Sequence, residues 1–183
     1  PTSTLWENNK IMATGRSNKI TQQIGEFLVS AELGKKGLIA TPFAGNVPEF
    51  DIIVADEYCR TLPIQVKASN SDSCKSTATE WMKINYNEKT KQQEYLGPLK
   101  IDNPELIYVF VRVFQDKKER DRYFILKKKN YQNICIEHYS SWMNTKNWKR
   151  PRSPKSYDCR PRIHDLAKFE DNWGIIKENL DKL

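Results

Sequence analysis

The sequence predicts an α/β fold built around a mixed β-sheet. Three observations support this: helical spacing of apolar residues in 18–36, short apolar or alternating runs within 38–68 and 106–126, and a second helical pattern in 130–143. Apolar residues recurring every three or four positions indicate a helix, whereas alternation or a short apolar run indicates a strand. The length of 183 residues favours a single domain.

The first helix is expected over residues 18–36, after a polar N-terminal segment of residues 1–17. Gly37 follows two lysines and is typical of a helix C-terminus. A short strand over 38–41 then ends at Pro42. The apolar residues that recur at helical spacing in the first helix are Ile20, Ile24, Phe27, Leu28, Ala31 and Leu33.

A β-hairpin is expected next. Residues 50–55 are nearly all apolar, which is typical of a strand buried on both faces. Residues 56–61 form the turn, and residues 62–68 alternate between two faces. Leu62, Ile64, Val66 and Ala68 share one face, and Pro63, Gln65 and Lys67 share the other. The short turn makes the two strands antiparallel neighbours.

The remaining elements alternate with polar segments. Residues 69–105 are a polar insert with a short strand near 81–85, and strands over 106–114 and 123–126 flank a charged turn. A helix over 130–143 completes a core of residues 18–143. Residues 144–183 form a C-terminal extension, a basic loop to 162 and a final helix over 171–180. The inward faces of the two helices are Tyr131, Ile134, Cys135, His138 and Trp142, then Trp173, Ile176 and Leu180.

The composition favours a nucleic-acid partner. The net charge is +7 and the pI is near 9.2, which suits a polyanion. No apolar run reaches the roughly 18 residues of a membrane span, and residues 1–19 hold no signal-peptide core. A soluble, cytoplasmic protein is therefore expected. The chain starts at Pro1, which leaves open a removed initiator methionine or a fragment. No glycine-rich phosphate loop supports nucleotide hydrolysis.

Four cysteines, none in a Cys-x-x-Cys pair, are expected to be free thiols. A zinc site that combines Cys135 with His138 and Cys159 with His164 is the less favoured alternative, because structural zinc ligands are usually more tightly spaced.

Polar residues on the predicted hairpin point to a cation site. Asp51 opens an apolar strand, and a buried carboxylate is costly without a partner. Gln65 and Lys67 lie two residues apart and therefore point to one side. Asp51 with the carbonyl of Gln65 or Val66 would supply the oxygen ligands that magnesium prefers. Lys67 would orient the attacking water or stabilise charge on a phosphate.

Two segments then resemble the PD-(D/E)XK nuclease superfamily, which includes restriction endonucleases, Holliday-junction resolvases and some homing endonucleases. Residues 48–69, PEFDIIVADEYCRTLPIQVKAS, are similar to its signature, and residues 24–43, IGEFLVSAELGKKGLIATPF, to the preceding helix. The resemblance implies a restriction-endonuclease-like core, DNA as substrate, phosphodiester hydrolysis, and Mg²⁺ with Mn²⁺ as a substitute. By position, Glu26 is the helix glutamate, Asp51 the metal aspartate and Lys67 the catalytic lysine.

The sequence departs from this pattern in two places. Gln65 stands where an acid is usual, as in a subgroup that includes some homing endonucleases, and the site therefore carries one fewer negative charge. This leaves open an inactive DNA-binding or scaffold module. Pro48 and Asp51 are not contiguous, so Glu49 is an alternative acidic ligand.

Simpler roles exist for each of these residues. Glu26 could be a solvated helix glutamate, with Glu32 as its competitor on another face. Lys67 could be an edge-strand lysine and Gln65 a polar residue at the sheet edge.

The basic loop is a candidate DNA contact. Trp148 and Tyr157 interleave with cations, a combination that suits phosphate contacts and stacking. A solvated loop is the alternative. An RNA nuclease of the same fold is a third functional hypothesis, and a homodimer would allow both strands to be cut. The basic residues concerned are Lys146, Lys149, Arg150, Arg152, Lys155, Arg160 and Arg162.

Overall fold

A computed structural model describes residues 15–43, 49–114 and 119–183, with side chains from residue 17 onward. Most of the polar N-terminal segment, the turn at 45–48 and part of the charged turn at 115–122 lie outside these residues. None of the helices in the described part of the chain combines the length and hydrophobicity that a membrane crossing requires.

The core of the fold is a five-stranded sheet with the order β1-β2-β3-β7-β8. The strands are β1 (Ile39–Pro42), β2 (Ile52–Ala55), β3 (Thr61–Ser69), β7 (Ile107–Arg112) and β8 (Arg122–Lys127). β3 and β7 are parallel, and the other neighbours are antiparallel. The predicted mixed α/β sheet is confirmed.

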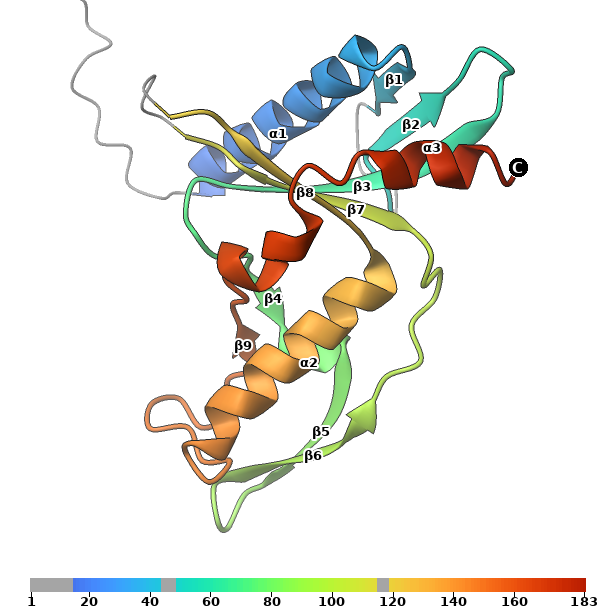
Figure 1. The fold of residues 1–183 in the computed structure, drawn as a ribbon. Coiled ribbons are helices and arrows are strands. Elements are labelled where there is room, and N and C mark those ends of the chain that lie inside the picture. Colours follow the sequence, from blue (N-terminus) through green and yellow to red (C-terminus); the bar gives the residue numbers. More distant parts are fainter. Residues whose placement is uncertain (1–14, 44–48, 115–118) are drawn as a thin grey trace, which may run out of the picture.

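Helices cover both faces of this sheet (Figure 1). α1 (Gly15–Lys35) and α3 (Gly174–Leu180) lie on one face, and α2 (Lys128–Asn144) lies on the other. Beside α2 are two 3₁₀ helices, η1 (Ala78–Glu80) and η2 (Ile163–Phe169), and two small sheets. The small sheets pair β4 (Ser76–Thr77) with β9 (Asp158–Cys159), and β5 (Met82–Asn87) with β6 (Gln92–Pro98).

Alternation along β3 and β7 divides the apolar side chains between two cores. Ile64 and Val66 face α1 together with Ile107 and Val109. On the opposite face, Tyr108 and Phe110 of β7 pack toward α2 and η1. The predicted alternation of β3 is therefore confirmed, and Gln65 and Lys67 lie on the α2 side of the sheet.

The insert between β3 and β7 holds more structure than the single short strand predicted at 81–85. β5 and β6 form a hairpin whose turn is fixed by Asn87. Its Oδ1 accepts hydrogen bonds from the backbone N–H groups of Lys89 (2.9 Å) and Thr90 (3.1 Å). An asparagine that bonds its own following backbone is a common turn former.

The first helix is confirmed, but its buried face differs from the predicted one. Val29 and Leu33 are fully buried, whereas Ile20, Ile24 and Phe27 are 40–58% exposed. Apolar residues recur at helical spacing along two adjacent faces of α1. The face that is buried against β3 is the one that includes Gly25. The predicted stop is confirmed, since Gly37 has φ +80°.

Three further predictions need correction. Residues 50–55 are not buried on both faces, because Ile53 and Ala55 are only half-buried. On α2 the predicted Tyr131, Ile134 and Cys135 are buried, but His138 is only half-buried and Trp142 is 38% exposed. Tyr139 and Met143 are the buried residues in that half of the helix. The final helix begins at residue 174 instead of 171, and η2 precedes it. Ile176 and Leu180 point inward as predicted.

Gly25 sets the distance between α1 and β3. A Cβ atom at this position would lie 2.4 Å from Cβ of Ala68 and 3.5 Å from a methyl group of Val66. Separations below 3 Å are not tolerated, so the helix backbone approaches the strand more closely than any residue with a side chain allows. This close approach brings the neighbouring helix positions to the edge of β3.

Gly25→Ala should destabilise the protein although alanine is the better helix former. Overpacking costs about 1–3 kcal/mol and the gain in helix propensity is about 1 kcal/mol, so we expect a net loss of stability. Gly34→Ala is the matched control, because nothing lies within 4 Å of its added methyl group. It should raise stability by about 0.5–1 kcal/mol. Urea unfolding of the two variants measures this, and equal stabilisation by both would contradict the close contact.

Candidate active site at the open edge of β3

β3 extends beyond the end of β2, and this leaves part of its edge without a neighbouring strand. The β2–β3 pairing covers residues 61–64 of β3 only. Beyond Ile64, the edge groups of Val66 and Ala68 still need hydrogen-bond partners, because buried backbone groups are rarely left unpaired. Side chains from two other segments supply these partners.

Asp51 continues the ladder that β2 ends. Its N–H donates to the carbonyl of Ile64 at 2.9 Å, and its Oδ2 accepts the N–H of Val66 at 2.8 Å. Asp51 is also the cross-strand neighbour of Gln65, whose Nε2 donates to the same Oδ2. The carboxylate is therefore fixed at the end of the hairpin, as the sequence predicts.

Gln22 of α1 completes the edge. Its Nε2 donates to the carbonyl of Val66 at 2.8 Å, and its Oε1 accepts the N–H of Ala68 at 3.1 Å. The same Nε2 lies 3.3 Å from Oε1 of Glu26, one turn further along the helix. The side-chain amide of Gln22 therefore contacts both the Glu26 carboxylate and the Val66 carbonyl, and these two groups lie close together. Sequence reasoning missed Gln22, although its i, i+4 spacing to Glu26 was a usable signal.

Both carboxylates are held in an unfavourable environment. Burial raises the pKa of Glu26, Gln22 partly opposes this, and the negative charge of Asp51 raises it further. Burial also raises the pKa of Asp51 against the opposing effects of Val66 N–H, Lys67 and Gln65. Two acids that repel each other at a partly buried site are a common feature of cation sites and catalytic sites.

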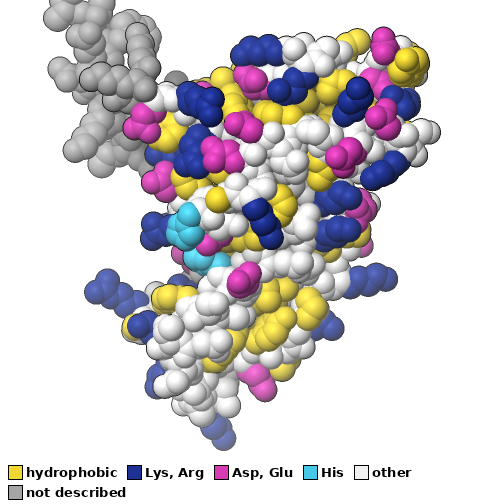
Figure 2. Space-filling view, in the orientation of Figure 1, with side chains coloured by type: hydrophobic (Ala, Val, Ile, Leu, Met, Phe, Trp, Pro, Cys, Tyr) yellow, Lys and Arg dark blue, Asp and Glu magenta, His cyan; other side chains and the backbone are white. Residues whose placement is uncertain are grey.

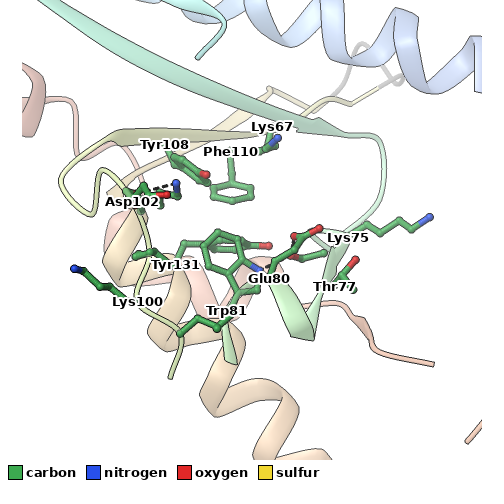
Figure 3. A pocket seen from close by; sticks show the side chains of 14 residues that line it. Lys67, Lys75, Thr77, Glu80, Trp81, Lys100, Asp102, Tyr108, Phe110 and Tyr131 are labelled. Atoms are coloured by element: carbon green, nitrogen blue, oxygen red, sulfur yellow. Dashed lines mark hydrogen bonds between the residues drawn. The ribbon is translucent and has the colours of Figure 1, made fainter. Parts of the chain in front are cut away.

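Lys67 stands on the solvent side of this cluster, between two cavities. One has a volume of about 570 Å³ and extends toward the insert, where Lys75, Lys100 and Tyr108 line it (Figure 3). The other, of about 540 Å³, runs past Gln22 and the end of β3. Lys67 lines both cavities, so an extended ligand could cross the site over this lysine.

The alternative acids lie elsewhere. Glu49 accepts a hydrogen bond of 2.5 Å from Asn103, which lies in the loop before β7. Its carboxylate is also 4.0 Å from Nζ of Lys128. Glu32 pairs with Lys35 at 2.6 Å. Neither contacts the edge of β3, so Glu26 and Asp51 are the carboxylates that converge there.

The oxygen atoms at the site suit a hard divalent cation. Carboxylate oxygens of Glu26 and Asp51, the carbonyl of Val66 and the free Oε1 of Gln65 are the ligand types that magnesium prefers. Within residues 15–43, 49–114 and 119–183 there is no group of three or more His, Cys, Asp or Glu side chains with metal-site geometry. Glu26 and Asp51 are the two acidic side chains at the site, and the neighbouring Gln65 is an amide.

The predicted free thiols are confirmed. All four cysteines are free, and Cys135 and Cys159 are buried together. Nδ1 of His138 lies 3.1 Å from Asp165, and Nε2 of His164 is equally close to the same residue. Both histidines therefore face a carboxylate, and the zinc alternative has no support in this part of the chain.

The predicted DNA-binding loop packs mainly on the β5–β6 hairpin. Trp148 stacks on Tyr95 with ring centroids 6.2 Å apart, and Lys155 pairs with Glu88 at 2.5 Å. Arg150 is half-buried and donates to a backbone carbonyl. Basic and acidic side chains also alternate over the upper half of the face in Figure 2. The other cations of the loop, Lys146, Lys149, Arg152, Arg160 and Arg162, are exposed.

Arg160 is the member of this loop that approaches the candidate site. It lines the second cavity together with Gln22 and Lys67, and it also pairs with Asp158 at 2.7 Å. A DNA contact by any residue of this loop, Arg160 included, stays a prediction.

Comparison with protein-family models finds no match, and comparison with curated proteins finds none either. Among solved structures, the chain is similar to the bacterial homing endonuclease I-Ssp6803I, with a TM-score of 0.38 and 12% identity. The alignment covers 64% of this chain and 73% of the endonuclease chain. A likeness this distant carries no conclusion about activity.

The raised pKa of Glu26 predicts a pH-dependent gain in stability for Glu26→Gln. The folded state binds the proton of Glu26 more tightly than the unfolded state, so its contribution to stability is lost as pH rises through the folded pKa. We expect Glu26→Gln to melt at a higher temperature than the wild type at pH 8. The difference should vanish near pH 4, where both side chains are neutral.

Thermal melting at the two pH values, without divalent ions, measures this difference. Glu32→Gln is the control, because Glu32 is paired with Lys35 on another face of α1. An equal or lower melting temperature for Glu26→Gln at pH 8 would contradict the electrostatic assignment.

Proposed function

We propose that the protein is a metal-dependent DNA endonuclease that hydrolyses phosphodiester bonds. The observation that carries this proposal is the convergence of Glu26, Asp51, the Val66 carbonyl and Gln65 at the open edge of β3, with Lys67 beside them. The residues come from a helix, a strand end and a neighbouring strand, and only the folded chain brings them together.

Magnesium, with manganese as a substitute, is the proposed cofactor. Glu26, Asp51 and the carbonyl of Val66 would hold it, with Oε1 of Gln65 as a further neutral ligand. When bound, the divalent ion supplies positive charge that stabilises the negative charge developing on a phosphate. Burial raises the pKa of Glu26 and the charge of Asp51 adds to this effect, and the ion would offset that repulsion.

The chain itself would contribute position and charge. The N–H of Val66 keeps the carboxylate of Asp51 in place, and Gln22 fixes the peptide that carries the carbonyl. Lys67 would donate hydrogen bonds to the attacking water or to a phosphate oxygen. Donors fixed in advance of the reaction stabilise a transition state without reorganisation.

DNA is the proposed substrate for two reasons. The net charge of +7 favours a polyanion. Cavities on both sides of Lys67 offer a path for a strand across the site, and Arg160 extends one of them.

A DNA-binding module without catalysis is the second candidate, and one observation favours it. Nε2 of Gln65 donates to Asp51 and also to the carbonyl of Val66 at 3.2 Å. An amide in this place satisfies the oxygen atoms that a cation would otherwise bind. Under this alternative the protein binds DNA and divalent ions do not lead to cutting.

Three variants test the proposed roles. Asp51→Asn should abolish nicking of supercoiled plasmid and also remove the rise in melting temperature caused by Mg²⁺ or Mn²⁺, because a ligand is lost. Lys67→Met should abolish nicking and retain the metal-induced rise, because the ammonium group is no ligand. Lys177→Met, on the opposite face of the sheet, should behave as wild type in both assays.

The measurements are thermal melting with and without metal and agarose-gel conversion of supercoiled to open-circular plasmid. Normal nicking by Asp51→Asn or by Lys67→Met would show that the assignment is wrong. DNA binding by the wild type, without nicking in either metal, would favour the second candidate.

Gln65→Glu distinguishes the two candidates further. Without metal it should lower the melting temperature, since a carboxylate replaces the amide that donates to Asp51. Mg²⁺ should restore the melting temperature. An active wild type is expected to stay active with this change. A variant that nicks plasmid when the wild type does not would assign the inactivity to Gln65.

A further inference from the structure

A tyrosine on β7 stands directly beside the candidate metal site. Tyr108 is the neighbour of Gln65 in the parallel β3–β7 register, as Phe110 is of Lys67. Because both strands alternate in phase, the ring of Tyr108 lies on the same face of the sheet as Gln65 and Lys67. Figure 3 shows Tyr108, Phe110 and Lys67 along one wall of the cavity.

The hydroxyl of Tyr108 is open to the cavity, although most of the side chain is buried. Only 7% of Tyr108 is exposed, and its ring packs against Trp81, Phe110 and Tyr131 with centroids 6.1–6.5 Å apart. Among the described residues, no donor or acceptor forms a hydrogen bond with the hydroxyl. The fully buried side-chain atoms without a partner in the described residues are Oγ of Ser140 and Nε of Arg150, so the Tyr108 hydroxyl is accessible at the cavity surface. A ligand in the cavity could therefore accept a hydrogen bond from it.

Unpaired cations surround the same cavity. Lys67, Lys75 and Lys100 line it, and none of the three forms a salt bridge with a residue in the described part of the chain. Lys128 also lines it but is engaged, with its Nζ 2.9 Å from the carbonyl of Asp102. The carboxylate of Glu80 faces the cavity from the insert and accepts a hydrogen bond from Ser76.

We propose that this cavity binds a phosphate group of the DNA strand next to the bond that is cut, with the Tyr108 hydroxyl as hydrogen-bond donor and Lys100 as counter-charge. The inference rests on the proposed nuclease function and adds a substrate contact to it. The insert forms the far wall, so β7 and the insert hold the strand between them on the approach to Lys67.

The hydroxyl of Tyr108 is protonated at neutral pH and can act as a donor. Burial raises the pKa of Tyr108 to about 12, and the charges of Glu49, Glu80 and Asp51 contribute. Glu80 also acts against an anionic ligand, so its removal should favour binding. A phosphate contact therefore predicts weaker binding when the Tyr108 hydroxyl or the Lys100 charge is removed and tighter binding when the Glu80 charge is removed. A purely structural role of these residues predicts neither.

The test is fluorescence anisotropy of labelled duplex DNA with the full chain, in EDTA so that no cutting occurs, at several salt concentrations. Tyr108→Phe should weaken binding about tenfold, the loss expected for one hydrogen bond to a charged group. The salt slope should stay unchanged because no charge is removed. Lys100→Met should weaken binding and reduce the slope by about one. Glu80→Gln should tighten binding.

Tyr139→Phe is the matched control. Tyr139 is also buried, but its hydroxyl donates to Gln93 at 2.6 Å and lies outside the cavity. Its loss should lower the melting temperature and leave DNA binding unchanged. Tyr108→Phe should leave the melting temperature unchanged, since it removes no hydrogen bond within the described residues.

The outcomes separate this inference from the proposed function. Wild-type affinity in both Tyr108→Phe and Lys100→Met, in a protein that nicks plasmid, overturns the cavity contact and leaves the nuclease intact. Weakened binding in these variants, in a protein that nicks nothing, supports the contact and removes the catalytic proposal. A wild type that binds no DNA overturns both.

Inorganic phosphate provides the last arm of the test. If it displaces DNA no better than chloride at equal ionic strength, the cavity recognises phosphate within the strand, as proposed. If it displaces DNA more strongly than chloride, and Tyr108→Phe removes that excess while binding DNA normally, the cavity is a site for free phosphate and the proposal fails.

Discussion

The unpaired edge of β3 is the constraint on which the candidate site depends. β2 ends opposite Ile64, and beyond this point β3 has no neighbouring strand on the β2 side, although β7 pairs with its other edge. The backbone groups of Val66 and Ala68 would be costly to leave unsatisfied. Asp51 and Gln22 satisfy them, so the hydrogen bonds that complete the sheet also position the polar groups of the site. Gln22 reaches the strand because no side chain separates α1 from β3 at Gly25.

This arrangement explains how the fold tolerates two carboxylates that repel each other. Burial is unfavourable to the charged forms of Glu26 and Asp51. The N–H of Val66 nevertheless holds Asp51 directly, and Gln22 links Glu26 to the carbonyl of Val66. The apolar cores on the two faces of the sheet supply the stability that the edge gives up. Destabilising charge that is held by a stable scaffold is common at functional sites.

The sequence alone predicted the part of the site that depends on local periodicity. A short turn and a period of two are sufficient to bring Asp51 near Gln65 and to put Lys67 on the same side. Glu26 was predicted from resemblance to a family. Helical spacing alone could not identify it, because the spacing fits two different faces of α1. The contacts of Gln22 and Tyr108 with the site could not be predicted from local periodicity, although the spacing of Gln22 to Glu26 was a signal. One depends on the close approach at Gly25 and the other on the parallel β3–β7 register, and both are tertiary features.

The parallel register also determines how catalysis and substrate selection could be divided in this fold. Gln65 is beside Tyr108 and Lys67 is beside Phe110, so the side chains of the candidate site on β3 and the cavity wall on β7 lie on one face of the sheet. A slip of one residue between β3 and β7 would turn Tyr108 toward α1 and close this connection. The opposite wall comes from the insert between the two strands. Under the proposed function, changes in the insert would alter the cavity wall that meets the substrate without moving the groups at the edge of β3. One fold can serve different substrates in this way.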